Sequence, residues 1–203
     1  MKNKKPLISI IILNYNAGDL ILNCINSVVQ TKYENYEIIL VDNVSIDNSH
    51  KKCKEKFEKI QLIENSKNFG FCEGNNIGVR NARGEFIIII NPDTTVTPNW
   101  IDKFLNAQKE NGDGIYQPKI ISLEDKKTIL STGNMIHLFG FGFARDKGNK
   151  YTDHLEKVET GLLTHSQAIK QIQDSNENWG LLGFDNITDV IDFVTDIKVK
   201  YSC

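Results

Sequence analysis

Two short and strongly apolar stretches of this chain each run directly into polar residues that carry an acid. Residues 38–41 run into Asp42, and residues 86–90 run into an Asn-Pro-Asp triplet that ends at Asp93. Apolar runs of this length, rich in isoleucine, are typical of strands buried in a parallel sheet. The carboxyl ends of parallel strands meet at one edge of the sheet, where α/β folds bind their ligands. We therefore expect two carboxylates at a ligand-binding edge.

Apolar and amphipathic stretches alternate along the first half of the chain. Short apolar runs predict strands, apolar residues at helical spacing predict helices, and glycine, asparagine and proline mark the turns between them. The expected strands cover residues 7–13, 37–41, 60–63 and 86–90, and the expected helices cover residues 19–31, 45–57, 74–82 and 98–108. This order predicts an α/β fold, with a mostly parallel sheet, right-handed crossovers and helices on both faces.

Composition bounds the class of protein. The chain has 203 residues, enough for one domain of ordinary size plus an appendage, and a formal net charge of −2 argues against a broad nucleic-acid-binding surface. Its four cysteines show no C-x-x-C spacing, so we expect reduced thiols rather than a disulfide framework. No apolar run approaches the ~20 residues that a membrane span needs. The chain is therefore expected to be a cytoplasmic protein without a membrane span.

Charge is distributed unevenly along the chain. Residues 1–150 hold 20 Lys and Arg against 17 Asp and Glu, whereas residues 151–203 hold 4 against 9. A change of sign near Tyr151 can mark a domain boundary or an interaction surface. We expect one α/β domain over residues 1–150 and an acidic segment over residues 151–203.

Several separated motifs carry a family resemblance. They read SIIILNYN, EIILVDNVSIDNS and NSKNFGFCEGNNIGVRNARGEFIIIINPDTTVTPNW. From about residue 6 to 120 the chain resembles family 2 glycosyltransferases, and within them the rhamnosyltransferase-like subgroup. The resemblance implies a GT-A-like, or Rossmann-like, fold and an inverting transfer of sugar from a nucleotide sugar. The acceptor would be a saccharide, a lipid-linked molecule or a protein, in the assembly of cell-surface polysaccharide or other glycoconjugates.

The resemblance also implies a divalent metal, Mg²⁺ or Mn²⁺. Sugar transfer leaves a nucleoside diphosphate, whose negative charge a metal held by a carboxylate can stabilise. Asp93 is the predicted metal ligand, and Asn91 stands where the family usually has the first acid of an Asp-x-Asp motif. We expect Asn91 to contact the donor and a single carboxylate to hold the metal. The alternative is that Asp93 only forms a turn.

Two loops are expected to contact the nucleotide. In the family, the acid matching Asp42 contacts the base or ribose, and its neighbour Asn43 belongs to the same predicted site. The alternative for Asp42 is a helix cap or an Asx turn, in which its carboxylate accepts backbone N–H groups. Asn14, Tyr15 and Asn16 match the family's other nucleotide-contact loop. Tyr15 would either stack on the base or pack under the loop.

A glycine-bearing stretch matches the family's donor loop. The predicted donor contacts are Asn68, Gly70, Gly74 and Asn76, because glycines let a backbone approach a ligand closely and an amide offers both donor and acceptor. The alternative is that the glycines supply turn dihedrals and that Asn75 caps the next helix. Both interpretations remain open on the sequence.

The resemblance ends after about Glu159, where the family carries an acidic pair whose carboxylate is the general base. This chain lacks that pair, so Asp185, Asp189 and Asp192 are the only candidates for a base, and they would equally suit the solvent face of a helix. The tail is expected to form a short divergent α/β segment. The competing function is a shortened non-catalytic relative that binds nucleotide sugar or serves as an interaction module.

Three further expectations concern the cellular location, residues 133–145 and the histidines. An enzyme acting on lipid-linked acceptors would work at the inner face of the cell membrane, which is compatible with peripheral association. Residues 133–145 alternate glycine with aromatics, which suits an extended segment beside a sugar or a strand-turn-strand. The histidines share no metal-ligand spacing and are expected at the surface or in loops: His50, His137, His154 and His165.

Overall fold

A computed structural model describes residues 5–136 and 142–150, with the side chains of residues 134–143 excepted. The chain divides into two compact units, residues 1–114 and residues 115–203. The predicted boundary between residues 150 and 151 stays a prediction, because the segment beyond it lies outside the described residues. In the part of the chain that the structure describes, no helix is long and apolar enough to cross a membrane.

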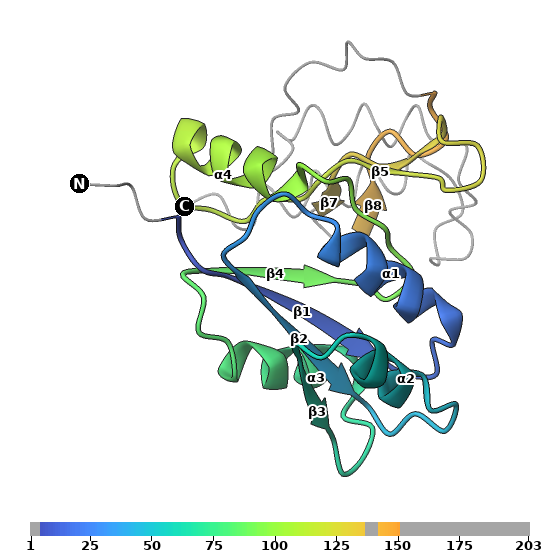
Figure 1. The fold of residues 1–203 in the computed structure, drawn as a ribbon. Coiled ribbons are helices and arrows are strands. Elements are labelled where there is room, and N and C mark those ends of the chain that lie inside the picture. The colour runs from blue at the N-terminus through green and yellow to red at the C-terminus, as the bar shows by residue number, and fades with distance from the viewer. Residues whose placement is uncertain (1–4, 137–141, 151–203) are drawn as a thin grey trace, which may run out of the picture. The chain divides into compact units, whose positions relative to one another are not determined.

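The first unit is built on a four-stranded parallel sheet (Figure 1). Its strands are β1 (Ile8–Asn14), β2 (Tyr36–Asp42), β3 (Ile60–Glu64) and β4 (Phe86–Ile90), in the order β3-β2-β1-β4. Its helices are α1 (Asp19–Val29), α2 (Ser49–Lys56), α3 (Gly70–Arg80) and α4 (Trp100–Asn111). The predicted parallel α/β fold is confirmed, because every pairing in this sheet is parallel.

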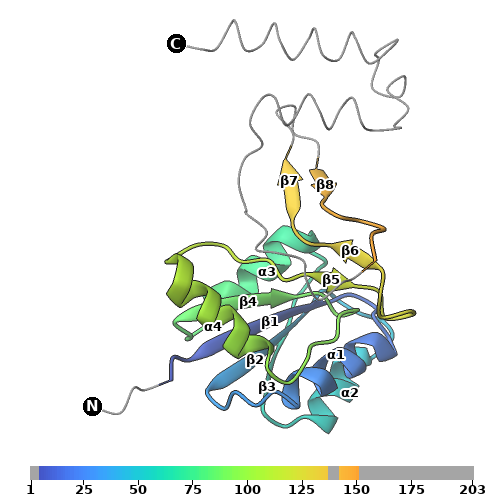
Figure 2. The ribbon, with the colours of Figure 1, turned by 90° about the horizontal axis from the view of Figure 1, so that it is seen from above.

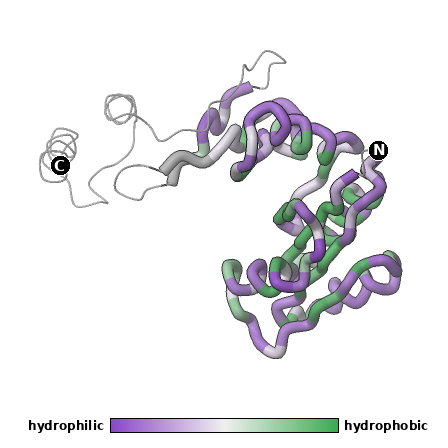
Figure 3. The backbone as a smooth tube through the Cα atoms, turned by 90° about the vertical axis from the view of Figure 1, so that its left-hand side faces the viewer, coloured by the Kyte–Doolittle hydropathy of each residue, from purple (hydrophilic) through white to green (hydrophobic). Residues whose placement is uncertain are grey.

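Alternating residues of β1 divide the core into two layers. Ile8, Ile10 and Ile12 pack with residues of α1, α2 and α4, whereas Ile11 and Leu13 pack with residues of α3. Figure 2 shows α3 on one side of the strands and α1 and α2 on the other. Residues of β1 and β2 are almost all buried, and Figure 3 shows hydrophobic segments in green along the backbone. Helices therefore cover both faces, as predicted.

Three helix starts differ from the prediction. Helix α2 begins at Ser49 rather than at residue 45, and α3 begins at Gly70 rather than at residue 74. Helix α4 begins at Trp100 rather than at Pro98. Pro98 lies outside the helix because its carbonyl accepts hydrogen bonds from the loop after α1, including the backbone N–H of Lys32 at 2.9 Å. Long-range contacts, which the local pattern does not contain, set where these helices begin.

The second unit contains two small antiparallel pairs. Strand β5 (Ile120–Ile121) pairs with β6 (Ile129–Ser131), and β7 (Asn134–Ile136) pairs with β8 (Gly142–Ala144). The second pair agrees with the strand-turn-strand alternative for residues 133–145. The helices and strand expected in the tail lie outside the described residues.

Candidate functional site

The strand order of the first unit contains a topological switch point. Successive crossovers run from β1 to β2 to β3, and the next one returns to place β4 on the other side of β1. In parallel α/β sheets, ligands bind at such a reversal, in the crevice outside the carboxyl ends of the strands. Asn14 ends β1, Asp42 ends β2 beside it, and Asp93 follows β4. The sheet thus places all three predicted residues at one edge.

Asp42 is buried at this edge, with only 2% of its surface exposed. Its Oδ1 accepts hydrogen bonds from Asn14 Nδ2 at 2.8 Å and from Ser45 Oγ at 2.6 Å. Its Oδ2 accepts the backbone N–H of Ser45 at 2.8 Å. The structure therefore shows the turn role that was the alternative for Asp42. A direct contact with a nucleotide stays a prediction.

Hydrogen bonds tie the loop after β1 to the loop after β2. The backbone N–H of Asn16 donates to Ser45 Oγ at 2.9 Å, and Asn16 Oδ1 accepts the N–H of Ile46 at 2.8 Å. The N–H of Gly18 donates to Asp47 Oδ2 at 2.8 Å. Burial alone would raise the pKa of Asp47, but hydrogen bonds from Ser49 and Gly18, with nearby His50, outweigh burial and lower it. The two loops are therefore held to each other by hydrogen bonds within the protein.

Apolar side chains stand exposed on these two loops. Tyr15 is 56% exposed and Ile46 is 85% exposed. Tyr15 therefore does not pack under the loop, and its ring is free to stack on a base. Exposed aromatic and aliphatic groups beside fixed polar groups are usual in small-molecule sites.

Val44 adopts a left-handed backbone conformation, with φ of 62°. This conformation costs a residue with a side chain about 1–2 kcal/mol, and β-branched residues adopt it rarely. We predict that Val44→Gly raises the free energy of unfolding by about 1 kcal/mol, measured by urea denaturation. The control is Ile46→Gly in the same exposed loop, where φ is not positive, and it should lower stability. Equal losses in both variants would contradict the assigned strain.

Several residues of the predicted donor loop contribute to the start and the packing of α3. Asn43 Nδ2 donates to the carbonyl of Gly70 at 3.1 Å, and Asn68 Oδ1 accepts the N–H of Gly70 at 2.8 Å. A Cβ on Gly74 would lie 2.5 Å from Leu13 Cδ1, so this glycine lets the helix approach the sheet. Gly70 has φ of 77° and supplies a turn dihedral.

Asn76 and Asn75 have different surroundings on α3. Asn76 is exposed on α3, where it contacts the carboxylate of Glu73. Asn75 does not cap the helix, because its Nδ2 donates to the carbonyl of Phe71 inside it. A donor contact by Asn76 stays a prediction.

Asp93 differs from Asp42 in being exposed. It lies in a turn closed by the N–H of Thr94, which donates to the carbonyl of Asn91 at 3.1 Å. None of the hydrogen bonds formed among the described residues engages its carboxylate. Nearby, burial and the charge of Asp93 raise the pKa of the Cys24 thiol to about 12, so Cys24 is no nucleophile at neutral pH. In residues 5–133 and 144–150, no three His, Cys, Asp or Glu side chains gather to hold a metal. A metal here would therefore take most ligands from a diphosphate and water.

The expectation that His50 lies at the surface or in a loop is wrong. His50 is on the inner side of α2 and only 4% exposed. Its ring lies between Asp42 and Glu64, with each nitrogen 3.3 Å from one carboxylate oxygen. A polar, lysine-rich helix gave no periodic signal of which residue faces inward. The other three histidines, and the base candidates Asp185, Asp189 and Asp192, lie outside the described residues.

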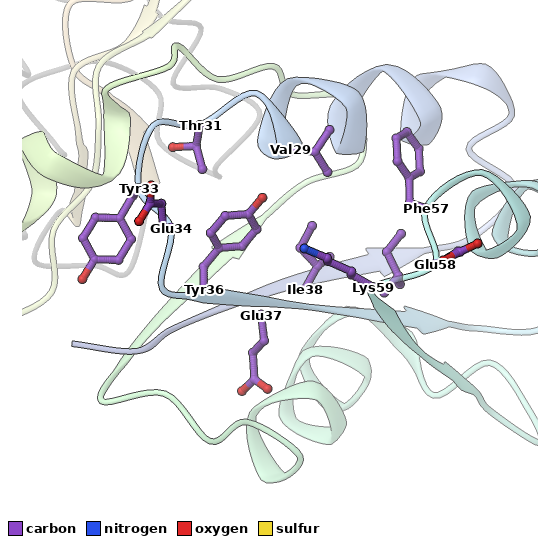
Figure 4. A pocket seen from close by; sticks show the side chains of 11 residues that line it. Val29, Thr31, Tyr33, Glu34, Tyr36, Glu37, Ile38, Phe57, Glu58 and Lys59 are labelled. Carbon is purple, nitrogen blue, oxygen red and sulfur yellow. The ribbon is translucent and has the colours of Figure 1, made fainter. Parts of the chain in front are cut away.

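A hollow of about 450 Å³ lies at the amino ends of β2 and β3, at the other edge of the sheet. Figure 4 shows three of its lining side chains, with Val29 from α1 between Tyr36 and Phe57. Glu37 points to the opposite side of the strand (Figure 4), where its carboxylate accepts hydrogen bonds from Ser9 and Arg83. Burial would raise the pKa of Glu37, but those hydrogen bonds outweigh it and lower the pKa. Nothing in the sequence predicted this hollow, and it contains none of the predicted site residues.

Comparison with known proteins decides the family. Residues 9–172 match the sequence model of the family described as glycosyl transferase family 2. The chain belongs to this family. Its parallel sheet with helices on both faces is the GT-A type of fold. The match continues beyond Glu159, where the resemblance was expected to end.

Three of the relatives share no more than 31% of the matched residues with this chain, and they are longer than it. Glycosyltransferase GlyG of Streptococcus pneumoniae is 31% identical over 111 residues, covering 53% of this chain and 37% of that protein. Poly(ribitol-phosphate) beta-glucosyltransferase of Bacillus spizizenii is 27% identical over 188 residues, covering 80% and 30%. Mannosyltransferase PcManGT from Pyrobaculum calidifontis, solved with GDP-Man and Mn²⁺, is 24% identical with a TM-score of 0.48, covering 55% and 34%. The chain spans about a third of the length of these relatives.

Proposed function

We propose that this family 2 chain binds a nucleotide sugar at the carboxyl edge of β1, β2 and β4, and transfers the sugar with inversion. The observation that carries the proposal is the pair of hydrogen-bonded loops around Asn14 and Asp42, fixed at the switch point of the sheet. Loops that are already held in place lower the entropy cost of binding, because the ligand does not have to order them.

The nucleotide and the metal would occupy neighbouring parts of this edge. Tyr15 offers an exposed ring for the base, and the loop that Asp42 anchors would contact the base or ribose. Asp93 fits a divalent metal shared with the diphosphate, because its exposed carboxylate is not engaged by the described residues. Mg²⁺ and Mn²⁺ commonly take one or two protein carboxylates and complete their shell with phosphate oxygens and water. When bound, the metal would stabilise the charge of the leaving diphosphate.

The acceptor and the place of action belong to the same proposal. A relative named as a poly(ribitol-phosphate) beta-glucosyltransferase and one named as a putative teichuronic acid biosynthesis glycosyltransferase support a saccharide or lipid-linked acceptor in polysaccharide assembly. Such an enzyme would work in the cytoplasm, at the inner face of the cell membrane. Asp185, Asp189 and Asp192 stay the candidates for the general base.

A second function follows from the sequence of the tail. No Glu-Asp pair is present where the family places its base, which favours a non-catalytic relative that binds nucleotide sugar. Removing a positioned general base typically costs about 10²–10⁴-fold in rate. Donor binding without transfer to a broad panel of acceptors would support this alternative.

The test of the proposed site is calorimetric titration with UDP, GDP and other nucleoside diphosphates. With Mn²⁺ we expect one of them to bind at least about tenfold more tightly than with chelator, because the metal neutralises diphosphate charge. Asp93→Ala should bind equally in both conditions and keep its melting temperature. Asp102→Ala, which removes an exposed acid of α4, is the matched control and should behave like the unmodified protein. Equal affinity of the unmodified protein with and without chelator would rule out the metal.

A further inference from the structure

A buried imidazole bridges two neighbouring strand ends beside the proposed site. Asp42 and Glu64 are register partners at the carboxyl ends of β2 and β3. His50 Nδ1 lies 3.3 Å from Asp42 Oδ1, and His50 Nε2 lies 3.3 Å from Glu64 Oε1. Nδ1 is buried and forms no hydrogen bond with the described residues, Asp42 included, so its approach to Asp42 is a contact between a ring nitrogen and a carboxylate oxygen. The ring therefore spans from a buried carboxylate to one whose side chain is 57% exposed.

The protonation state of His50 decides how many of these contacts it can make. A neutral imidazole carries one N–H and can donate to only one carboxylate, whereas the imidazolium donates to both. The other acid near the ring is Asp47 in the loop before α2, and the other titratable group on its side of the helix is Cys53. Three carboxylates thus lie near His50, two of them in contact with its ring nitrogens.

Asp42 is the link from His50 to the nucleotide loops. The same Oδ1 that faces His50 accepts from Asn14 and Ser45, and Ser45 in turn accepts from the backbone of Asn16. An N–H from His50 would add a charged donor to this oxygen and hold the carboxylate in place. Without that N–H, Asp42 keeps only its neutral donors.

We propose that His50 is a positioning residue that makes nucleotide affinity depend on pH, holding Asp42 and its loops in the binding arrangement when protonated. Glu64 is the solvent-facing partner that receives the second N–H. The inference rests on the proposed function, because it concerns the nucleotide site anchored by Asp42. Linkage is reciprocal, so nucleotide binding must also take up a proton at a pH where His50 is partly neutral.

The experiment compares affinity and proton uptake between pH 6 and pH 8. UDP, or whichever nucleoside diphosphate binds best, is titrated with Mg²⁺ in buffers of different ionisation enthalpy, which reports the protons bound. The unmodified protein should lose at least about fivefold in affinity over this range. His50→Asn should show a smaller loss of affinity and lower proton uptake, and the pH dependence that is left in this variant comes from groups other than His50, the diphosphate among them. Glu64→Gln should fall between them.

The outcomes separate this inference from the proposed function. If His50→Asn does not fold, Glu64→Gln, which alters an exposed side chain, carries the comparison. A pH profile and proton uptake identical to those of the unmodified protein in the variants that fold would overturn the role of His50 while leaving the nucleotide site intact. If the unmodified protein binds no nucleoside diphosphate at any pH, the proposed function and the inference both fail.

Discussion

Replacing Asp42 by asparagine should lower the free energy of unfolding by about 3 kcal/mol, the cost of losing hydrogen bonds to a buried charged acceptor. Three donors point at this carboxylate: Asn14 Nδ2, Ser45 Oγ and the N–H of Ser45. An amide would turn an NH₂ group toward one of them and leave that donor without an acceptor. Urea denaturation followed by circular dichroism measures the loss.

Nucleotide affinity should fall along with stability in Asp42→Asn, because the loops after β1 and β2 are joined through this residue. Asp19→Asn is the control, since Asp19 is exposed in the first turn of α1 and should change stability by less than about 1 kcal/mol. Unchanged stability with lost nucleotide affinity would show that Asp42 acts on the nucleotide and not through its loop. Lowered stability with unchanged affinity would remove Asp42 from the site altogether.

The second large effect is expected at the contact between α3 and β1. A Cβ on Gly78 would lie 2.4 Å from Ile11 Cγ2 and 3.2 Å from Val41 Cγ2, so no side chain fits there. Gly78→Val should lower the free energy of unfolding by about 3 kcal/mol, because overpacking displaces the helix from the sheet. The measurement is again urea denaturation.

A compensating variant tests the cause of that loss. Ile11→Ala alone should cost about 2–5 kcal/mol through the cavity it leaves, and the double variant should lose clearly less than the sum of the two. Valine has a higher helix propensity than glycine, so a loss of stability in Gly78→Val cannot come from helix propensity. Additive losses in the double variant would mean that Gly78 is required for a reason other than its contact with Ile11.

The strands could be predicted from the sequence because each is an uninterrupted apolar run. Strand β4 matches its predicted bounds, β3 differs by one residue at one end, and β1 and β2 differ by one residue at each end. Their parallel pairing then followed from the alternation with helices. The strand ends placed Asp42 and Asp93 at a common edge, which is the part of the site that local patterns can reach.

The remainder of the site depends on contacts between distant residues. Helix α2 was expected from residue 45 but begins at Ser49, because Asn16 and Gly18 of another loop hydrogen-bond to residues 45–47 and hold them in a turn. His50 sits among lysines in the sequence, and only the fold shows that it faces Asp42. The burial of Asp42 was missed for the same reason, since an acid after a strand is equally compatible with a surface position.

The central claim is tested most directly by measuring hydrogen exchange of the full chain with and without a nucleoside diphosphate. The measurement shows which backbone segments the nucleotide protects. We predict that UDP or GDP with Mg²⁺ slows exchange in residues 14–18, 42–48 and 91–95, which form the loops at the carboxyl edge. Residues 31–36 and 57–60, beside the hollow at the amino edge, should exchange as before. Protection confined to residues 31–36 and 57–60, or no protection in any of these segments at saturating nucleotide, would contradict the account.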